Sequence, residues 1–191
     1  MDIYTVVKTR RSIRRFSQSP VSVEVLEKII DAARYAPSGG NVQPWKIIVV
    51  VDEEKVSEIF DNIFWLKAAG KPTKGEAPTG YFIILGNPEM SKCYREDCCA
   101  LIQNILLLCC AENIGTCWIG SFIREKICEI CSIPSPWEIV GVIAFGYPKE
   151  EVMSEEGIRG VAPSRDDRGV LHVFKRPMKE IFYINEFGKE Y

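Results

Sequence analysis

Four arginines stand close together near the start of the chain. Arg10, Arg11, Arg14 and Arg15 place four guanidinium groups within six residues. In an extended segment alternate residues face the same way, so Arg10, Ser12 and Arg14 share one side. A guanidinium group binds phosphate oxygens in pairs, and a serine hydroxyl can bond to a hydroxyl of a polyol. The cluster therefore favours a site for a phosphate joined to a polyol, and a solvated basic strip is the alternative.

A second polar stretch, residues 36–45, comes directly before an apolar run. It reads A-P-S-G-G-N-V-Q-P-W, so Pro37 ends the preceding helix and two glycines follow. Small residues let a planar ligand approach the backbone closely, and Ser38, Asn41 and Gln43 offer hydrogen bonds. The stretch is thus a second candidate for ligand contact. The alternative is a tight helix-to-strand connection in which Asn41 and Gln43 only hold the turn.

A single histidine, His172, limits the chemistry that side chains can supply. One imidazole cannot build a metal site that needs two or three, and it is the one candidate for a histidine-dependent nucleophilic triad. If the chain is an enzyme, we expect a bound cofactor to carry the difficult chemistry. His172 itself is interpreted as a partly exposed strand residue.

Eight cysteines are present, and one pair of them, Cys128 and Cys131, has the C-x-x-C spacing. A zinc site needs a second pair or a histidine at suitable spacing, and an iron–sulfur site needs four suitably placed thiolates. Most of the cysteines lie in apolar helical runs, where cysteine commonly packs in the core. We therefore assign no metal ligand, and a metal or redox role of this pair is the minority alternative.

Helical and strand patterns mix along the whole chain, which predicts an α+β fold around one sheet in a single domain, residues 1–191. Two polar stretches, residues 67–79 and 149–169, are expected to be loops. Helices are predicted at 2–9, from about 22 to before 37, at 53–63, 93–113 and 123–132, and after 177. Strands are predicted at 45–51, 81–85, 139–145 and 170–174.

The composition excludes several classes of protein. The chain has 191 residues, 47% of them hydrophobic, with 24 basic and 26 acidic residues and a net charge of −2. These values are typical of a globular protein and argue against a disordered chain and against a nucleic-acid binder. No apolar stretch reaches the ~18–20 residues of a membrane span, and we expect no secretory leader. A cytoplasmic protein with reduced cysteines is the expectation.

Five segments, in this order, resemble the motifs of the FMN-dependent nitroreductase family. They are Arg10 with residues 11–16 (R-S-I-R-R-F), residues 37–45 (P-S-G-G-N-V-Q-P-W), residues 113–120 (N-I-G-T-C-W-I-G), residues 146–148 (G-Y-P) and residues 175–177 (K-R-P). Each match alone is weak, but together they span nearly the whole chain. The resemblance implies a central, mostly antiparallel sheet flanked by helices, in a homodimer with FMN at the interface.

The resemblance also assigns roles to the basic residues. Arg10 and Arg176 would bind the FMN phosphate, with Lys175 nearby. Arg11 and Ser12 would contact phosphate and ribityl oxygens.

The remaining roles concern the flavin ring. The resemblance places Arg14 near the pyrimidine edge, where a cation stabilises the anion of the reduced flavin. Trp118, Ile119 and Gly120 would pass along the isoalloxazine, with a backbone N–H aimed at N5. The residues expected to reach the flavin of the partner subunit are Pro37, Ser38, Gly39 and Asn41.

The activity implied by the resemblance is a two-step exchange. NADH or NADPH, as a transient co-substrate, passes hydride to FMN, and a nitroaromatic, quinone or similar electron-poor acceptor then takes the electrons; no side chain is assigned as catalytic. One alternative is an oxygen-using or dehalogenating relative that also uses FMN. An alternative of another class is a cysteine-based metal-binding or redox-sensing protein. Residues 62–79 and 149–174 match no motif of the family.

Overall fold

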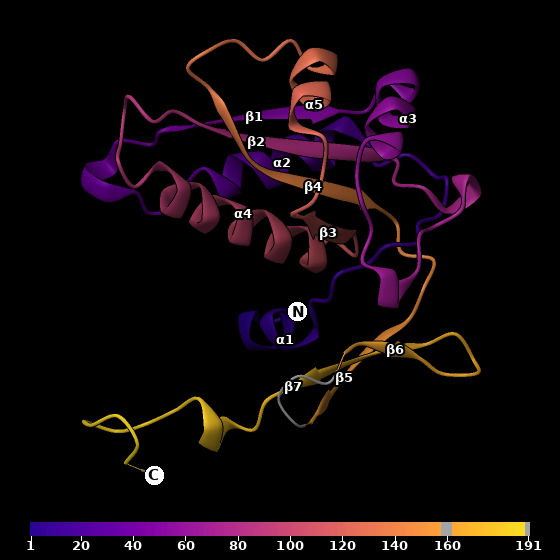
Figure 1. The fold of residues 1–191 in the computed structure, drawn as a ribbon, viewed down its shortest axis with the longest axis vertical. Coiled ribbons are helices and arrows are strands. Elements are labelled where there is room, and N and C mark those ends of the chain that lie inside the picture. Colours follow the sequence, from indigo (N-terminus) through magenta and orange to yellow (C-terminus); the bar gives the residue numbers. More distant parts are fainter. Residues whose placement is uncertain (158–161, 190–191) are drawn as a thin grey trace.

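The computed structural model describes residues 1–157 and 162–189, and a four-stranded sheet forms its centre (Figure 1). The strands are β1 (Trp45–Val50), β2 (Gly80–Gly86), β3 (Gly115–Ile119) and β4 (Glu138–Gly146). Their order is β1-β2-β4-β3, and every neighbouring pair is antiparallel. The α+β class and the antiparallel sheet are therefore confirmed. β3 lies at one edge of this sheet, and its outer side is where the candidate site is built.

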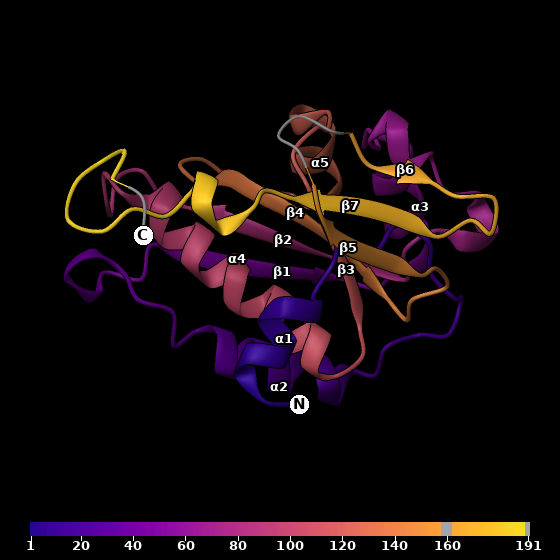
Figure 2. The same ribbon diagram turned by 90° about the horizontal axis from the view of Figure 1, so that it is seen from below.

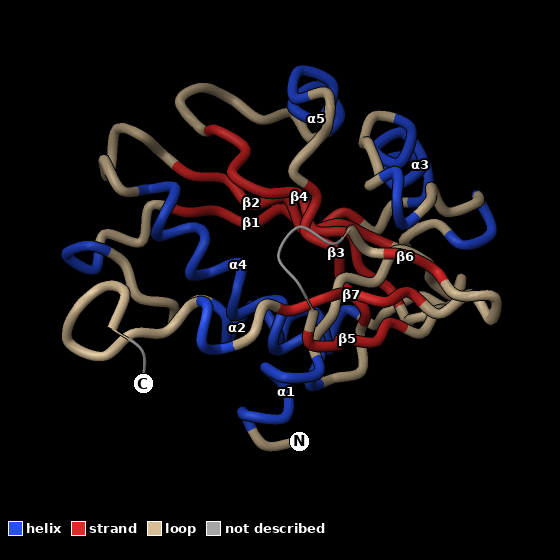
Figure 3. The backbone as a smooth tube through the Cα atoms, turned by 60° about the horizontal axis from the view of Figure 1, so that its bottom comes forward, coloured by secondary structure: helices blue, strands red, loops and turns tan. Residues whose placement is uncertain are grey.

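Helices cover both faces of the sheet (Figure 3). They are α1 (Ile3–Thr9), α2 (Val23–Ala33), α3 (Glu53–Asp61), α4 (Tyr94–Ala111) and α5 (Arg124–Ile130). α2 and α4 pack on one face, while α3 and α5 pack on the other. Ser22 is the predicted N-cap of α2, and its side chain accepts a hydrogen bond from the Val25 N–H.

Two apolar layers hold these helices to the sheet. Successive residues of β2 and β4 face opposite sides, as the two-residue period of a strand requires. One layer, under α2 and α4, contains Phe82, Ile84, Ile143 and Phe145. The other, under α3 and α5, contains Tyr81, Ile83, Val142 and Ala144. Because both faces are covered, the central strands are apolar throughout, which is why the sequence predicts them well.

A second, smaller sheet lies below the main one, beside α1 (Figures 1 and 2). It has the order β5-β7-β6, with β5 (Val152–Glu156) parallel to β7 (Leu171–Lys175) and antiparallel β6 (Ser164–Arg165) on the other side. The prediction of a loop over 149–169 is wrong for β5 and β6, and residues 158–161 of that stretch lie outside the described residues. β5 is half-buried and largely polar, so it lacks the apolar signal of a core strand.

Two further predictions are corrected by the structure. β3 is a strand, whereas the sequence pattern assigned residues 113–120 only to ligand contact. The helix expected after Pro177 is a single 3-10 turn, Met178–Glu180. Among the described residues no helix is long and apolar enough to cross a membrane.

His172 links the strands of the small sheet. Its Nδ1 contacts the Glu155 carboxylate on β5, and its Nε2 lies 3.5 Å from Oδ2 of Asp166, next to β6. The hydrogen bond to Glu155, with a second contribution from Asp166, raises the pKa of His172 above its ordinary value of 6.5.

A raised pKa makes the small sheet sensitive to pH. The imidazolium form is favoured in the folded protein, so its stabilisation is fully present below pH 6.5 and is lost as the pH rises through the folded pKa. We expect the hydrogen-exchange protection factors of β7 amides to fall between pH 6 and pH 9. A His172→Gln variant should show little of this change. Equal protection factors at both pH values in the unmodified protein would contradict the link.

Candidate functional site

The arginine segment of residues 10–15 runs along the outer edge of β3. Ser12 forms a parallel bridge with Thr116, and the Ile13 N–H donates a hydrogen bond of 2.8 Å to the Thr116 carbonyl. Gly115 makes this approach possible, because a Cβ at that position would lie 2.9 Å from the Cβ of Ile13. Two motifs that are far apart in the sequence, around Ser12 and around Trp118, therefore meet at one strand edge.

Beyond Thr116 the edge of β3 is open. The Thr116 carbonyl faces away from β4, and alternate residues of an antiparallel strand face the same way, so the Trp118 N–H also faces outward. The Ile119 N–H faces β4. Of the β3 residues predicted to contact the flavin, Trp118 is therefore the one whose backbone N–H faces outward. The Trp118 side chain is 39% exposed, and nothing lies within 4 Å of the Cβ position of Gly120. A planar ligand can therefore approach the backbone closely here.

A cavity of about 530 Å³ lies at this open edge. Its volume falls within the range typical of small-molecule sites. Its lining consists of Arg14, Phe64, Trp65, Leu66, Lys67, Cys117, Trp118, Ile119, Gly120 and Ser121. Two cations and several aromatic or aliphatic side chains line it, and no carboxylate does, so the lining suits a planar ligand that carries negative charge.

Sequence reasoning missed residues 64–67, which form one wall of this cavity. They reach it because the Phe64 N–H donates to the Ser121 carbonyl at 2.8 Å, and Ile63 pairs with Phe122. The available signal is the adjacent aromatic pair Phe64 and Trp65, with Lys67 close behind it. An aromatic pair in a loop is a hint of binding, but the sequence does not say which site it serves.

A second cavity, of about 310 Å³, lies at the beginning of the arginine segment. Arg10 and Arg11 line it together with residues at the end of α4 and the start of β3. Arg11 bonds through Nη1 to the Arg10 carbonyl at 2.6 Å, and through Nη2 to the Lys8 carbonyl at 2.7 Å and to the Ser154 hydroxyl. Its Nε is buried without a partner in the described part of the chain.

The two guanidinium groups at this cavity affect each other. Burial, and then the charge of Arg10, lower the pKa of Arg11. Both effects disfavour the charged form of Arg11. An anion placed between the two guanidinium groups would favour that charged form. The second cavity is therefore the better candidate for a phosphate group, with Arg10 as the cation that is not already bonded to carbonyl groups.

The loop of residues 37–43 is held by its own contacts. The Ser38 hydroxyl accepts from the Gln43 N–H at 3.0 Å, and the Gln43 side-chain amide donates to Asn41 at 3.3 Å. The Gly39 N–H donates to Asp97 Oδ1 at 3.0 Å, near the start of α4. Pro37, Gly39 and Asn41 in this loop are exposed.

The loop and the arginine segment lie at opposite ends of α4 (Figure 1). Asp97 meets the loop, while Cys110 shares the second cavity with Arg10. At 1.5 Å per residue these two positions are about 20 Å apart along the helix axis. Within one chain the structure therefore does not bring the two predicted contact regions together.

Lys175 and Arg176 are exposed at the end of β7. Neither lines the cavity at Arg10. The predicted shared phosphate site of Arg10 and Arg176 is thus not assembled in the described chain, and the role of the basic pair stays a prediction.

The cysteines form no bonded pair, although all eight lie in the described residues. Over residues 1–157 and 162–189, no three or more histidine, cysteine, aspartate or glutamate side chains gather closely enough to hold a metal ion. Burial raises the pKa of both Cys128 and Cys131. Neither thiol is therefore activated as a thiolate, which a reactive redox pair requires.

Comparison with known proteins gives consistent results. The family model described as the nitroreductase family matches residues 7–147. An Archaeoglobus fulgidus protein, provisionally named an NADH dehydrogenase/NAD(P)H nitroreductase, is 37% identical over 157 residues, covering 76% of this chain and 85% of that protein. An iodotyrosine deiodinase from Thermotoga neapolitana is 26% identical, covering 78% of this chain and 89% of that protein. The crystal structure of a nitroreductase family protein from Clostridium novyi is 29% identical with a TM-score of 0.71, covering 100% of this chain and 97% of that one.

Proposed function

Since the chain belongs to the nitroreductase family, we propose that it is an FMN-dependent oxidoreductase that passes electrons from NADH or NADPH to an electron-poor acceptor such as a nitroaromatic or a quinone. A single domain, residues 1–191, carries the site. The observation that most supports this function is the open edge of β3, where the Trp118 N–H faces a cavity lined by Arg14 and aromatic side chains.

The residues present fit FMN. When bound, FMN supplies hydride acceptance and donation at N5. Arg10 lines the same cavity as Arg11, whose Nε lacks a partner in the described residues, and suits the phosphate. Ser12, which follows in the segment and bridges to Thr116, suits the ribityl chain. At the β3 edge the Trp118 N–H is the hydrogen-bond donor for the ring, and Arg14 holds positive charge near it. These groups bind and orient the cofactor, and no side chain needs to act as a catalytic acid or base.

A second copy of the chain completes the site. The loop carrying Pro37, Ser38, Gly39 and Asn41 is about 20 Å along α4 from the arginine segment, too far to meet the same flavin ring. A homodimer brings the loop of one copy to the cavity of the other. The exposed apolar residues of α1, Ile3, Tyr4 and Val7, are consistent with a surface that a partner covers.

The wall formed by residues 64–67 supports a preference among acceptors. Phe64 and Leu66 are exposed apolar side chains beside the cavity, and Lys67 adds a cation. A planar acceptor with a negatively charged substituent matches this lining. We also propose a cytoplasmic location, as expected from the sequence.

Two measurements test the proposed function. The visible spectrum of the purified protein should show bound flavin, or gain it on addition of FMN. Under anaerobic conditions NADH or NADPH should be consumed with a nitroaromatic or quinone. Turnover with oxygen alone would favour the oxygen-using alternative, and halide release would favour the dehalogenating one. A colourless protein that fails to bind added FMN would overturn the proposal.

An Arg10→Ala variant should bind FMN more weakly by roughly 1.5–3 kcal/mol, the value of a hydrogen bond to a charged group. This is roughly a 10- to 150-fold rise in Kd. Arg34→Ala is the control, because Arg34 is an exposed cation that pairs with Asp31 away from both cavities. Titration of the apoprotein with FMN measures the effect. Equal affinity of the Arg10→Ala variant and the unmodified protein would show that the phosphate lies elsewhere.

A further inference from the structure

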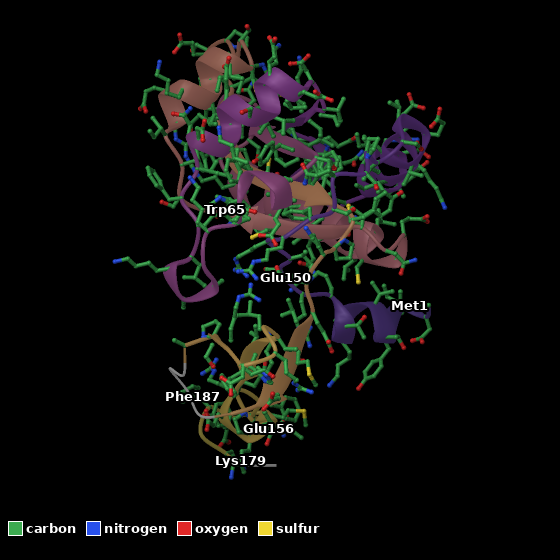
Figure 4. The ribbon with its side chains drawn as sticks, turned by 90° about the vertical axis from the view of Figure 1, so that its right-hand side faces the viewer. Met1, Trp65, Glu150, Glu156, Lys179 and Phe187 are labelled. Atoms are coloured by element: carbon green, nitrogen blue, oxygen red, sulfur yellow. The ribbon has the colours of Figure 1, made fainter. Side chains whose placement is uncertain are left out.

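Glu150 lies at the junction between the main body and the small sheet (Figure 4). Its side chain is 2% exposed. One oxygen, Oε1, accepts hydrogen bonds from the backbone N–H groups of Arg14 and Arg15, the second at 3.1 Å. The other oxygen, Oε2, pairs with Nη2 of Arg165. A buried carboxylate from the second half of the chain is thus bonded directly to the backbone of the arginine segment.

Arg165, on β6, extends this contact to the cavity wall. Its Nε donates to the Ala69 carbonyl at 3.1 Å, and its Nη1 donates to the Gly169 carbonyl at 2.7 Å. Ala69 lies two residues after the wall of residues 64–67. The pair of Glu150 and Arg165 therefore joins three segments: the arginine segment, the end of the cavity wall and the small sheet.

No other described side chain bonds to the backbone N–H of Arg14. The Arg14 guanidinium donates to the carbonyl of Ser12 at 3.3 Å, which lies in its own segment and cannot fix that segment in space. The Lys149 N–H donates to the Arg15 carbonyl at 2.9 Å and reinforces the same junction. The neighbours of Arg14 are held elsewhere, Ile13 by the Thr116 carbonyl and Phe16 by the Glu76 carbonyl at 3.0 Å. Among the described side chains it is Glu150, paired with Arg165, that bonds the N–H of Arg14 itself.

We propose that Glu150 and Arg165 are positioning residues: by fixing the backbone of Arg14 they hold its guanidinium at the cavity of the β3 edge, and this inference rests on the proposed function. Neither residue lines that cavity. Both therefore act through Arg14 and through Ala69, which lies just after the wall of residues 64–67. Neither needs to touch the cofactor.

A positioning role differs measurably from a merely structural one. Loss of a structural contact lowers the unfolding temperature and leaves the affinity of the folded molecules for FMN unchanged. Misplacing Arg14 changes that affinity, and it also lowers the midpoint potential of the bound flavin, because the cation favours the reduced, anionic form. The potential is thus the readout that stability alone does not move.

Glu150→Gln is the principal variant. Glutamine keeps an oxygen for the N–H groups of Arg14 and Arg15, but it removes the charge and turns an amide toward Arg165. We expect the FMN Kd to rise roughly 10-fold or more, as when a residue that orients the ligands of a metal site is replaced. We also expect the midpoint potential of the bound flavin to shift to a lower value. Glu151→Gln is the matched control, since Glu151 is exposed and contacts β7 only through its backbone carbonyl; both quantities should stay unchanged in it.

Arg165→Lys is the second variant and decides the question if Glu150→Gln does not fold. Lysine keeps a charge beside Glu150 but cannot reach Ala69 and Gly169 as well, so a smaller change in the same two quantities is expected. If the unmodified apoprotein fails to bind FMN, the proposed function falls and this inference with it. If the unmodified protein binds FMN, and the folded variants share its Kd and its potential, the positioning role is overturned and the proposed function stands.

Discussion

An Arg165→Met variant is expected to lose roughly 3–5 kcal/mol of unfolding free energy. The substitution removes the cation from Glu150, whose side chain is 2% exposed, and leaves that carboxylate buried with only two backbone N–H groups as partners. A buried charge without its counter-ion costs more than the pair contributes, since the desolvation penalty is no longer offset. For a chain of this size the melting temperature should fall by roughly 6–20 °C. Denaturant titration and thermal unfolding measure both.

Arg168→Met is the control for this prediction. Arg168 lies three residues away in the turn between β6 and β7, and its exposed side chain pairs with Asp166, so its loss should cost under about 1 kcal/mol. A double variant, Glu150→Leu with Arg165→Met, removes both charges and should recover part of the loss. Recovery stays incomplete because the N–H groups of Arg14 and Arg15 then lack an acceptor. A loss in Arg165→Met no larger than in Arg168→Met would contradict the buried pair.

A Gly115→Ala variant is expected to bind FMN roughly 10- to 150-fold more weakly, the effect of losing one hydrogen bond to a charged group when the arginine segment is displaced. The new Cβ would lie 2.9 Å from both Cβ and Cγ2 of Ile13. The Cβ of Ile13 is fixed to the backbone and cannot rotate away, so the arginine segment must move off β3. Overpacking of this kind should also cost roughly 1–3 kcal/mol of stability. Titration of the apoprotein with FMN, beside a denaturation curve, separates the two effects.

Gly75→Ala is the matched control, since nothing lies within 4 Å of its Cβ position. It should leave both FMN affinity and stability nearly unchanged. Adding Ile13→Ala to Gly115→Ala removes the two γ-carbons from the contact and should restore part of the affinity, since neighbouring substitutions are coupled. Unaltered FMN affinity in Gly115→Ala would mean that the close approach of the arginine segment to β3 does not matter for binding.

The sequence predicts those elements that are long and buried. β2 and β4 are apolar on both faces, and α4 runs for 18 residues, so their patterns are clear. β3 was missed because it has only five residues and begins with Gly115, a residue type depleted in strands. β5 was missed because it is only half-buried and largely polar, and its place is set by pairing with β7, which the local sequence does not reveal.

The residues of the candidate site also differ in how well the sequence predicts them. Arg10, Ser12, Arg14 and Trp118 belong to motifs, and the structure brings their two segments together at the β3 edge. The wall at Phe64 and Trp65 and the buried pair of Glu150 and Arg165 belong to no motif. Both depend on tertiary contacts, such as the bridge between Ile63 and Phe122, that a local pattern does not contain. The sequence thus predicts the residues proposed to touch a ligand better than those that hold them in place.

The contact between Glu150 and Arg14 has a consequence for the folding of the protein during its synthesis on the ribosome. The two residues are 136 positions apart. At the usual rate of translation, the carboxylate leaves the exit tunnel roughly 7–27 s after the backbone that it fixes. During that interval the arginines are already outside the ribosome; β3 emerges before its end, but the small sheet, which begins with β5 at Val152, does not. We therefore expect a nascent chain stalled before residue 150 to carry Arg10, Ser12 and Arg14 without the carboxylate that bonds the Arg14 N–H.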